Sequence, residues 1–240
     1  MVVLIRSVVF WIGYVLSIIL VCTALTVLFF FPRRWKFKLA ETLSRMILGW
    51  LAITCNLRYE IIGRENVPAT AFIAMGNHQS TWETASCQIF FNPATWVVKR
   101  ELLWIPIFGW GLWSISPVAL NRSAGRKAID HLLKQGAARL KKGISIIVFP
   151  EGTRVNSDER PPFKVGASLL AARTRADIVP FAHNAGKYWP KKGGFLKHPG
   201  TIRIIIGKPI QTKGMKAEQI NDIVETWIRA KQDELDKLDP

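Results

Sequence analysis

The feature that most constrains the fold is a segment of 24 residues without a charge, Val8–Phe31, close to the N-terminus. As an α-helix this segment would be about 36 Å long at 1.5 Å per residue, enough to cross the roughly 30 Å hydrocarbon core of a bilayer. A cleaved signal peptide is the alternative. However, the apolar run is long for one, and Pro-Arg-Arg-Trp follows it instead of a small-residue cleavage site. The sequence therefore predicts a membrane-anchoring helix over residues 8–31.

Basic residues are distributed unevenly around this segment. Only Arg6 and the amino terminus precede it, whereas four basic residues follow it closely: Arg33, Arg34, Lys36 and Lys38. Because the cytoplasmic side of membrane segments is enriched in Lys and Arg, this asymmetry predicts that the rest of the chain lies on the cytoplasmic face of the membrane.

Residues 35–56 repeat large apolar side chains at helical spacing, with polar residues on the other side. The apolar face consists of Leu39, Leu43, Met46, Ile47, Trp50 and Leu51. Such an amphipathic helix lies along a membrane surface or packs on the first helix, and a buried core helix is the alternative. We expect residues 1–56 to form a membrane-anchoring helical pair and residues 57–240 to form the main domain.

The whole chain is both basic and apolar. Its 33 Lys and Arg exceed its 17 Asp and Glu, which gives a formal net charge of +16, yet 49% of its residues are hydrophobic. That much apolar surface excludes a disordered chain. A nucleic-acid-binding protein is usually basic and hydrophilic, so the combination favours membrane lipids as the partner and predicts no nucleic acid.

The three cysteines, Cys22, Cys55 and Cys87, are scattered and form no Cys-x-x-Cys pair. They exclude a disulfide framework and offer no zinc-ligand pattern, so we expect a reducing compartment and no metal site.

From about residue 57 onward, short apolar runs alternate with helical patterns, which predicts an α/β sheet flanked by helices. The predicted strands are Arg58–Ile62, Ala71–Gly76, Thr95–Val98, Val118–Leu120, Ile144–Phe149, Asp177–Ala182 and Thr201–Gly207. The predicted helices are Thr81–Phe91, Ala124–Lys142, Gly166–Thr174 and Lys216–Leu238.

A histidine follows the strand that ends at Gly76, in the run Asn-His-Gln-Ser-Thr-Trp-Glu. If His78 lies in the turn and Glu83 one turn into the next helix, the carboxylate can fix the imidazole tautomer and stabilise the imidazolium. Two structural readings compete with this catalytic pair. His78 can be an ordinary loop histidine, and Ser80 with Glu83 forms a capping-box pattern, in which Glu83 is the third residue of the helix.

A second polar turn, Phe149-Pro150-Glu151-Gly152-Thr153-Arg154, follows another apolar strand. A glycine-containing turn with a cationic tip can present backbone N–H groups and an arginine to an anion. By itself, an ordinary turn that ends a strand is the alternative.

Together, these elements resemble the glycerolipid acyltransferases of the lysophosphatidic acid acyltransferase family. Residues 77–80 with Glu83 resemble the family's His–four residues–acid motif, and residues 149–154 match its Phe-Pro-Glu-Gly-Thr-Arg motif. Residues 99–110 resemble the block between them, Asn121-Arg122 its closing arginine, and residues 178–180 the last motif. The sequence departs from the family pattern at Glu83 and at Asn121, where Asp is the usual residue.

The resemblance implies a mixed α/β sheet and a reaction in which acyl-CoA or acyl-carrier protein donates an acyl group. The acceptor would be the sn-2 hydroxyl of lysophosphatidic acid, and the product phosphatidic acid, a step of phospholipid biosynthesis. In this reading, His78 is the general base and Glu83 orients it. The implied residues for the acceptor's phosphate and glycerol are Lys99, Arg122, Glu151, Gly152, Thr153 and Arg154. It implies no cofactor besides the thioester co-substrate, and residues 57–240 would be the catalytic domain.

Alternatives remain open at this point. The same chemistry can act on another lysophospholipid or an ornithine-lipid acceptor, and a non-enzymatic module could bind membranes or nucleic acid through its basic surface. Eight basic residues and no acid lie between Asp177 and Glu218, at positions 187, 191, 192, 197, 203, 208, 213 and 216. This run predicts a solvated basic face, or a surface for anionic headgroups, CoA or an acidic carrier, with Tyr188-Trp189-Pro190 in a membrane-facing loop.

Overall fold

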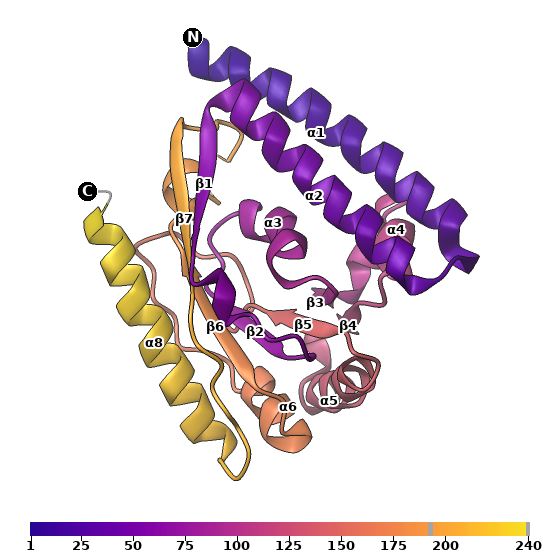
Figure 1. Ribbon diagram of the computed structural model, residues 1–240, viewed down its shortest axis with the longest axis vertical. Helices are drawn as coiled ribbons and strands as arrows, with labels where there is room; N and C mark the ends of the chain where they lie inside the picture. The colour runs from indigo at the N-terminus through magenta and orange to yellow at the C-terminus, as the bar shows by residue number, and fades with distance from the viewer. Residues whose placement is uncertain (192–193, 239–240) are drawn as a thin grey trace.

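The computed structural model describes residues 1–191 and 194–238, in which one seven-stranded sheet has helices on both faces (Figure 1). The strands are β1 (Leu57–Ile62), β2 (Ile73–Gly76), β3 (Ala94–Lys99), β4 (Val118–Leu120), β5 (Ser145–Val148), β6 (Ile178–His183) and β7 (Gly200–Ile206). The α-helices are α1 (Val2–Val27), α2 (Arg33–Cys55), α3 (Trp82–Phe91), α4 (Phe108–Ser114), α5 (Arg126–Leu140), α6 (Gly166–Thr174), α7 (Ala185–Tyr188) and α8 (Ala217–Leu238). Four short 3₁₀ helices join them: η1 (Leu28–Phe30), η2 (Arg64–Asn66), η3 (Arg100–Trp104) and η4 (Arg122–Ala124).

The sheet has the strand order β1-β7-β6-β2-β5-β3-β4. Every neighbouring pair is parallel except β6 and β7, which are antiparallel, so the predicted mixed sheet is confirmed. Strand β2 lies in the middle, between β5 and β6. Because all three run in the same direction, the segments that follow them emerge at one edge of the sheet, where α/β proteins usually place their sites.

Alternate side chains of the central strands divide between two apolar layers. Phe72, Ala74 and Phe181 face the core beneath α1, α2 and α3, whereas Ile73 and Met75 face the core beneath α5, α6 and α8. Strands covered on both faces read as continuous apolar runs, which is the pattern by which the sequence predicts them. All seven predicted strands are present, with ends shifted by at most two residues.

The apolar N-terminal helix is present but is placed differently from the predicted 8–31. Helix α1 already begins at Val2, because the single exposed charge of Arg6 does not interrupt a helix, and it passes into η1 at Leu28. It cannot continue because Pro32 follows, and Phe31, the residue before the proline, is extended with φ −76° and ψ 158°. Of the described residues, only the stretch Val2–Phe30 is long and apolar enough to cross a membrane.

Helix α2 packs on α1 and also contributes to the main core. Trp50 lies against Gly13, whose missing side chain makes room for the ring, and its Nε1 donates to the carbonyl of Val9 at 3.2 Å. On its other side, α2 contacts α3 through residues such as Ile47 and Leu51, which are buried. The helix ends at Asn56, which is left-handed with φ 51°, as a residue after a helix C-terminus often is.

Helix α4 has no counterpart among the predicted helices. Its seven residues include Gly109 and Gly111, which disfavour a helix in isolation, so it depends on packing. A Cβ atom at Gly111 would lie 2.7 Å from the Cβ of Cys22, which shows how closely α4 approaches α1. This contact explains why local sequence patterns do not reveal the helix.

The predicted membrane-facing loop around Trp189 is wrong, because α1 covers that side chain, which is 1% exposed. Lys197 is equally buried, with Nζ 4.3 Å from the ring centroid of Trp11 and 4.6 Å from that of Trp189. Arg203 pairs with Glu60 at 3.0 Å, and Lys187 lies 3.7 Å from Asp236. The basic run is therefore not one uniform face; its member Lys192 lies outside the described residues.

Candidate active site

His78 lies in the turn that joins β2 to α3. Strand β2 ends at Gly76, where any side chain would collide with the ring of Phe181, and α3 begins at Trp82. Between them, the chain turns over the edge of the sheet, so that His78 faces a cavity and its side chain is 16% exposed.

The predicted pairing of His78 with Glu83 is present. The Nδ1 atom of His78 lies 2.8 Å from Oε1 of Glu83, whose side chain is completely buried. A carboxylate accepts, so Nδ1 carries the proton and Nε2 of the neutral ring is left with a free electron pair. This is the tautomer that a general base needs.

The capping interaction is formed by the same carboxylate. Oε1 of Glu83 also accepts the N–H groups of Gln79 at 2.9 Å and Ser80 at 2.7 Å, while Ser80 Oγ accepts the N–H of Trp82. The helix begins one residue later than predicted, with Thr81 as its N-cap. Helix capping and pairing with His78 are therefore not alternatives for Glu83. The N–H groups at the start of α3 hold its carboxylate where it can contact Nδ1 of His78.

The carboxylate of Glu83 is kept in its charged form despite its burial. Burial raises its pKa, but His183, His78 and the N–H of Ser80 outweigh that effect, so the net pKa lies below the usual range. A carboxylate that accepts several N–H donors is stabilised as an anion. Glu83 can therefore balance a positive charge that forms on His78.

The ring of His78 is fixed from its face as well as from its edge. Phe149 stacks on it with the ring centroids 4.2 Å apart and an angle of 8° between the planes. In addition, the N–H of Val155 donates to the carbonyl of His78 at 2.8 Å. The two sequence motifs are thus joined into one site.

The turn after β5 and the 3₁₀ helix η4 after β4 each bring one arginine to the cavity beside His78. In the turn after β5, the N–H of Gly152 donates to the carbonyl of Phe149 at 3.0 Å. Gly152 itself adopts the left-handed conformation, with φ +76°. Arg122 Nη1 donates to the carbonyl of Gly152 at 2.5 Å. Arg154 is half-buried, and its Nε has no hydrogen-bond partner among the residues that the structure describes. Both guanidinium groups line the same cavity as His78 and leave donors for an anion.

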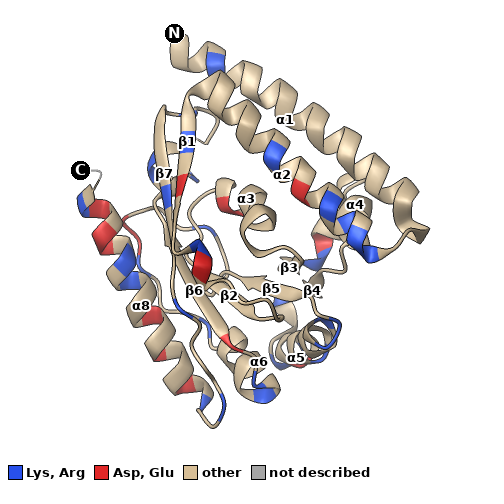
Figure 2. Ribbon diagram, in the orientation of Figure 1, with Lys and Arg blue, Asp and Glu red and all other residues tan. Residues whose placement is uncertain are grey.

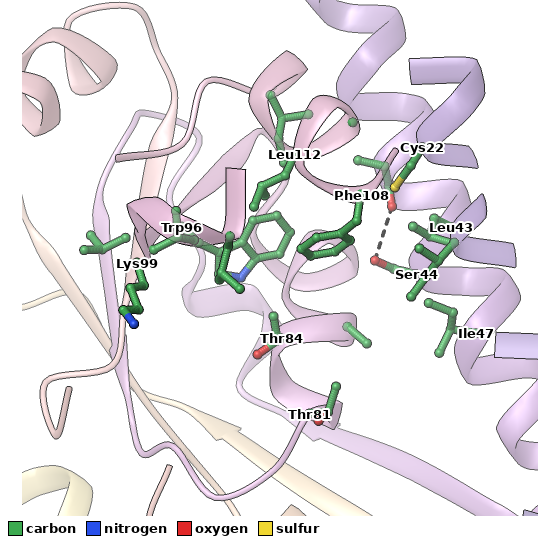
Figure 3. Close-up of a pocket in the computed structure, with 18 of the residues that line it drawn as sticks. Cys22, Leu43, Ser44, Ile47, Thr81, Thr84, Trp96, Lys99, Phe108 and Leu112 are labelled. Atoms are coloured by element: carbon green, nitrogen blue, oxygen red, sulfur yellow. Dashed lines mark hydrogen bonds between the residues drawn. The ribbon is translucent and has the colours of Figure 1, made fainter. Parts of the chain in front are cut away.

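That cavity has a volume of about 310 Å³ and extends from His78 between the sheet and the N-terminal helices. Leu43, Ser44 and Ile47 of α2 approach it from one side, and Trp96 and Lys99 of β3 approach it from the other (Figure 3). Apart from its cationic end, the lining is mostly apolar and includes Ile18, Cys22 and Leu25 of α1 and Phe108, Gly111 and Leu112 of α4. Its shape and chemistry suit a hydrocarbon chain whose reactive end lies beside His78.

Of the other predicted site residues, some lie at the cavity and others do not. Lys99 lines the cavity from the end of β3 and is exposed, and Gly152 holds Arg122 through its carbonyl. Thr153 is exposed but is not among the residues that line the cavity. Glu151 is buried beneath the site, where its Oε2 accepts the N–H of His78 at 2.8 Å. The structure thus places Glu151 on the protein side of His78, and not in the cavity.

Two parts of the site are absent from the sequence prediction. The ring of Phe149 belongs to a motif, but nothing in the sequence indicates that it stacks on His78. The walls that α1 and α2 contribute read only as membrane-anchor residues, since their apolar side chains carry no chemical signal. Within residues 1–191 and 194–238, no cluster of three His, Cys, Asp or Glu side chains forms a metal site.

Glu151 predicts a pH dependence of stability. Burial raises its pKa to about 7, against about 4.3 in an unfolded chain. Between these values, the folded protein holds a proton that the unfolded chain has released. The free energy of unfolding therefore falls as pH rises, by about 3 kcal/mol over the window. We expect Glu151→Gln to remove this fall.

The measurement is the difference in unfolding free energy between wild type and Glu151→Gln, in detergent, from pH 4.5 to 8. Burial lowers the pKa of His183, which gives an opposite slope, but this slope occurs in both proteins and cancels in the difference. Parallel stability curves for the two proteins would contradict the prediction.

Comparisons with known proteins agree with this geometry. A family model described as Acyltransferase matches residues 58–184. The 1-acyl-sn-glycerol-3-phosphate acyltransferase of Pseudomonas aeruginosa is 38% identical over 201 residues, and the match covers 82% of this chain and 77% of that protein. The enzyme of the same name from Saccharomyces cerevisiae is 32% identical, and the match covers 76% of this chain and 61% of that protein. The crystal structure of the 1-acyl-sn-glycerophosphate (LPA) acyltransferase PlsC from Thermotoga maritima superposes with a TM-score of 0.82 at 25% identity, covering 97% of this chain and 95% of that one.

Proposed function

Because this chain belongs to the acyltransferase family, we propose that it transfers an acyl group to the sn-2 hydroxyl of 1-acylglycerol-3-phosphate and forms phosphatidic acid. The donor is a thioester, acyl-CoA or acyl-carrier protein, and no further cofactor takes part. The observation that carries the proposal is the His78–Glu83 pair at the junction of an apolar cavity and two arginines. The relatives named for this reaction support the acceptor.

The reaction follows from the tautomer of His78. Its unprotonated Nε2 removes the proton of the acceptor's hydroxyl while the oxygen attacks the thioester carbonyl. The tetrahedral intermediate then collapses, the carbon–sulfur bond breaks, and the imidazolium returns the proton to the leaving thiolate. Glu83 stabilises the imidazolium in between, and the chemistry needs no covalent acyl-enzyme.

The arginines are the proposed ligands of the acceptor's phosphate. A charge-assisted hydrogen bond contributes about 1.5–3 kcal/mol, so Arg154→Ala should weaken acceptor binding by roughly 10- to 150-fold. Arg122→Ala should act similarly, although it also removes the bond to Gly152. The measurement is KM for each substrate, with Arg126→Ala as the control, since Arg126 is exposed and lies outside the cavity lining.

A panel of acceptors completes this test. Wild-type protein should prefer 1-acylglycerol-3-phosphate over lysophospholipids with larger headgroups and over a lyso-ornithine lipid, which has no phosphate. Arg154→Ala should reduce that preference. The proposal fails if the phosphate-free acceptor is the better substrate, or if the substitution raises only the KM of the thioester.

We further propose that α1 is immersed in one leaflet instead of crossing the bilayer. Helix α1 contacts the rest of the protein at Phe10, which meets Trp189 with centroids 5.3 Å apart, and again at Cys22, which meets Gly111. These positions are about 18 Å apart along the helix. If α1 crossed the bilayer, the part of the protein that packs against it between Phe10 and Cys22, including Lys197, would have to lie in the hydrocarbon core.

The exposed residues fit that orientation. Phe30 is 93% exposed, and Trp110 and Trp113 of α4 lie exposed near the same end of α1. Basic residues gather at the start of α2, beside α4, where they can meet anionic headgroups (Figure 2). The catalytic domain would then lie on the cytoplasmic face, together with both chain termini.

This orientation predicts where the N-terminus lies. In inside-out vesicles, an impermeant maleimide should label Val2→Cys as readily as Lys237→Cys, because both ends are on one side of the membrane. The three native cysteines are buried and provide a low background. The protein should also resist carbonate and high-salt washes. Labelling of Val2→Cys only after permeabilisation would indicate a crossing helix, and release by salt alone would exclude immersion.

A further inference from the structure

The peptide group that joins Asn77 to His78 is held at both of its polar atoms by buried side chains. Its carbonyl accepts from Nε2 of His183 at 2.9 Å, and its N–H donates to Oε2 of Glu151 at 2.8 Å. His183 is the last residue of β6 and Glu151 follows β5, so the two strands beside β2 each supply one side chain. Neither side chain lines the cavity.

The hydrogen-bond donor and acceptor of His183 are defined. Its Nδ1 accepts the N–H of Ala185 at 3.3 Å, so Nε2 carries the proton that binds the carbonyl of Asn77. Burial lowers the pKa of this histidine, which favours the neutral ring that the arrangement needs. Protonation of Nδ1 would remove the bond from Ala185.

Asn77 is also fixed through its side chain. Its Nδ2 donates to the carbonyl of His183 at 2.9 Å, and its Oδ1 accepts the N–H of His183 at 3.0 Å. These two bonds continue the pairing of β2 with β6 beyond Gly76, where the strand itself ends. His183 therefore binds the segment before His78 through both backbone and ring.

The same histidine ring lies beside the carboxylate of the catalytic pair. Nε2 of His183 is 3.8 Å from Oε2 of Glu83, and that oxygen has no hydrogen bond to the described residues. His78 is thus surrounded on its protein side by groups that fix either its backbone or its partner. Small displacements of this backbone would move Nε2 of His78 relative to the acceptor's hydroxyl.

We propose that His183 and Glu151 are positioning residues that clamp the Asn77–His78 peptide and thereby aim the imidazole at the substrate. This inference rests on the proposed role of His78 as the general base. It assigns Glu151 to the support of His78 and not to contact with the acceptor's glycerol or phosphate.

The test compares pairs of substitutions at each position. His183→Leu removes the donor to Asn77, whereas in His183→Gln the side-chain amide can replace Nε2–H. Glu151→Ala removes the acceptor of the His78 N–H, whereas Glu151→Gln retains an oxygen for it. A misplacement of about 1 Å can cost about 100-fold in rate. We therefore expect His183→Leu and Glu151→Ala to lower kcat by about that factor, with little change in acceptor KM, and the Gln variants to recover most of the loss.

The control for general destabilisation is Thr212→Val. Thr212 is buried, and its hydroxyl donates to the carbonyls of Ala171 and Ala176, away from the cavity lining. Melting temperatures are measured for all variants. The clamp is excluded if kcat falls no further than in an equally destabilised Thr212→Val, or if Glu151→Ala raises acceptor KM while kcat holds.

A spectroscopic readout separates the clamp from the catalytic proposal. The chain has only four histidines, so ¹⁵N-histidine labelling in detergent can resolve them. The Nδ1 proton that His78 shares with Glu83 should give a downfield signal in wild type and in the Gln variants, and this signal should be lost in His183→Leu and Glu151→Ala. A signal that persists in the latter two variants overturns the clamp. Full activity of His78→Ala would instead refute the role of His78 as the general base. That result would not change the Nδ1 signal of the wild-type protein, so the two failures can be told apart.

Discussion

Replacing His78 with alanine should lower kcat by about 10²–10⁴-fold, the usual contribution of a positioned general base. The substitution removes the imidazole that faces the cavity. Among the described residues that line the cavity, His78 is the only histidine, and its pairing with Glu83 leaves Nε2 unprotonated. Folding should persist, because the side chain is partly exposed and Glu83 keeps its two backbone donors.

Initial rates at saturating substrates, together with melting temperatures, test this expectation. His131→Ala provides the matched control, since His131 is exposed on α5. Near-normal turnover of His78→Ala would remove His78 from the mechanism. A melting temperature that falls as far as the activity does would show that the histidine supports the fold and leave its chemical role without support.

Glu83→Gln should have a comparable effect on turnover, about 10²–10⁴-fold, with a loss of stability of only about 1 kcal/mol. The amide oxygen can still accept the N–H groups of Gln79 and Ser80, so the start of α3 is preserved. A neutral amide, however, cannot balance the imidazolium. Its NH₂ group can also donate to Nδ1 of His78 and hold the ring in the wrong tautomer.

Glu83→Asp separates charge from reach. This substitution keeps the carboxylate but shortens the side chain by one methylene. The oxygens therefore lie farther from His78 Nδ1 than in the wild-type protein, where Oε1 is 2.8 Å away. We expect activity between those of wild type and Glu83→Gln. If Glu83→Gln turns over like wild type, Glu83 is only a helix cap. If both variants lose stability and activity in proportion, the loss is structural.

The sequence predicts the sheet well because its strands are buried on both faces. Within the predicted strands Ile144–Phe149 and Asp177–Ala182, residues 146–149 and 178–182 are continuous apolar runs, and such runs leave few alternatives to a central strand. The pairing of His78 with Glu83 is one of the readings that the sequence allows, because both residues lie close to a strand–helix junction, and the structure shows the contact.

The remaining features depend on contacts between distant segments. Helix α4 forms because Gly111 can approach Cys22, and no local pattern encodes that contact. Glu151 shares a motif with Arg154, yet its side chain turns inward to the N–H of His78 while Arg154 faces the cavity. Neighbours in the sequence can therefore serve opposite sides of a site, and the direction in which each side chain points is decided by the fold.

The cavity walls supplied by α1 and α2 have a consequence for how this protein can change over time. Side chains such as Leu25 and Ile47 lie in the cavity lining, while other faces of the same two helices carry exposed apolar side chains such as Leu20 and Ile53. A shift or rotation of either helix to suit a thicker or thinner bilayer would also reshape the space beside His78. Substitutions that adapt these two helices to different membrane lipids would therefore also change which fatty acyl chains fit the cavity. The two properties would evolve together.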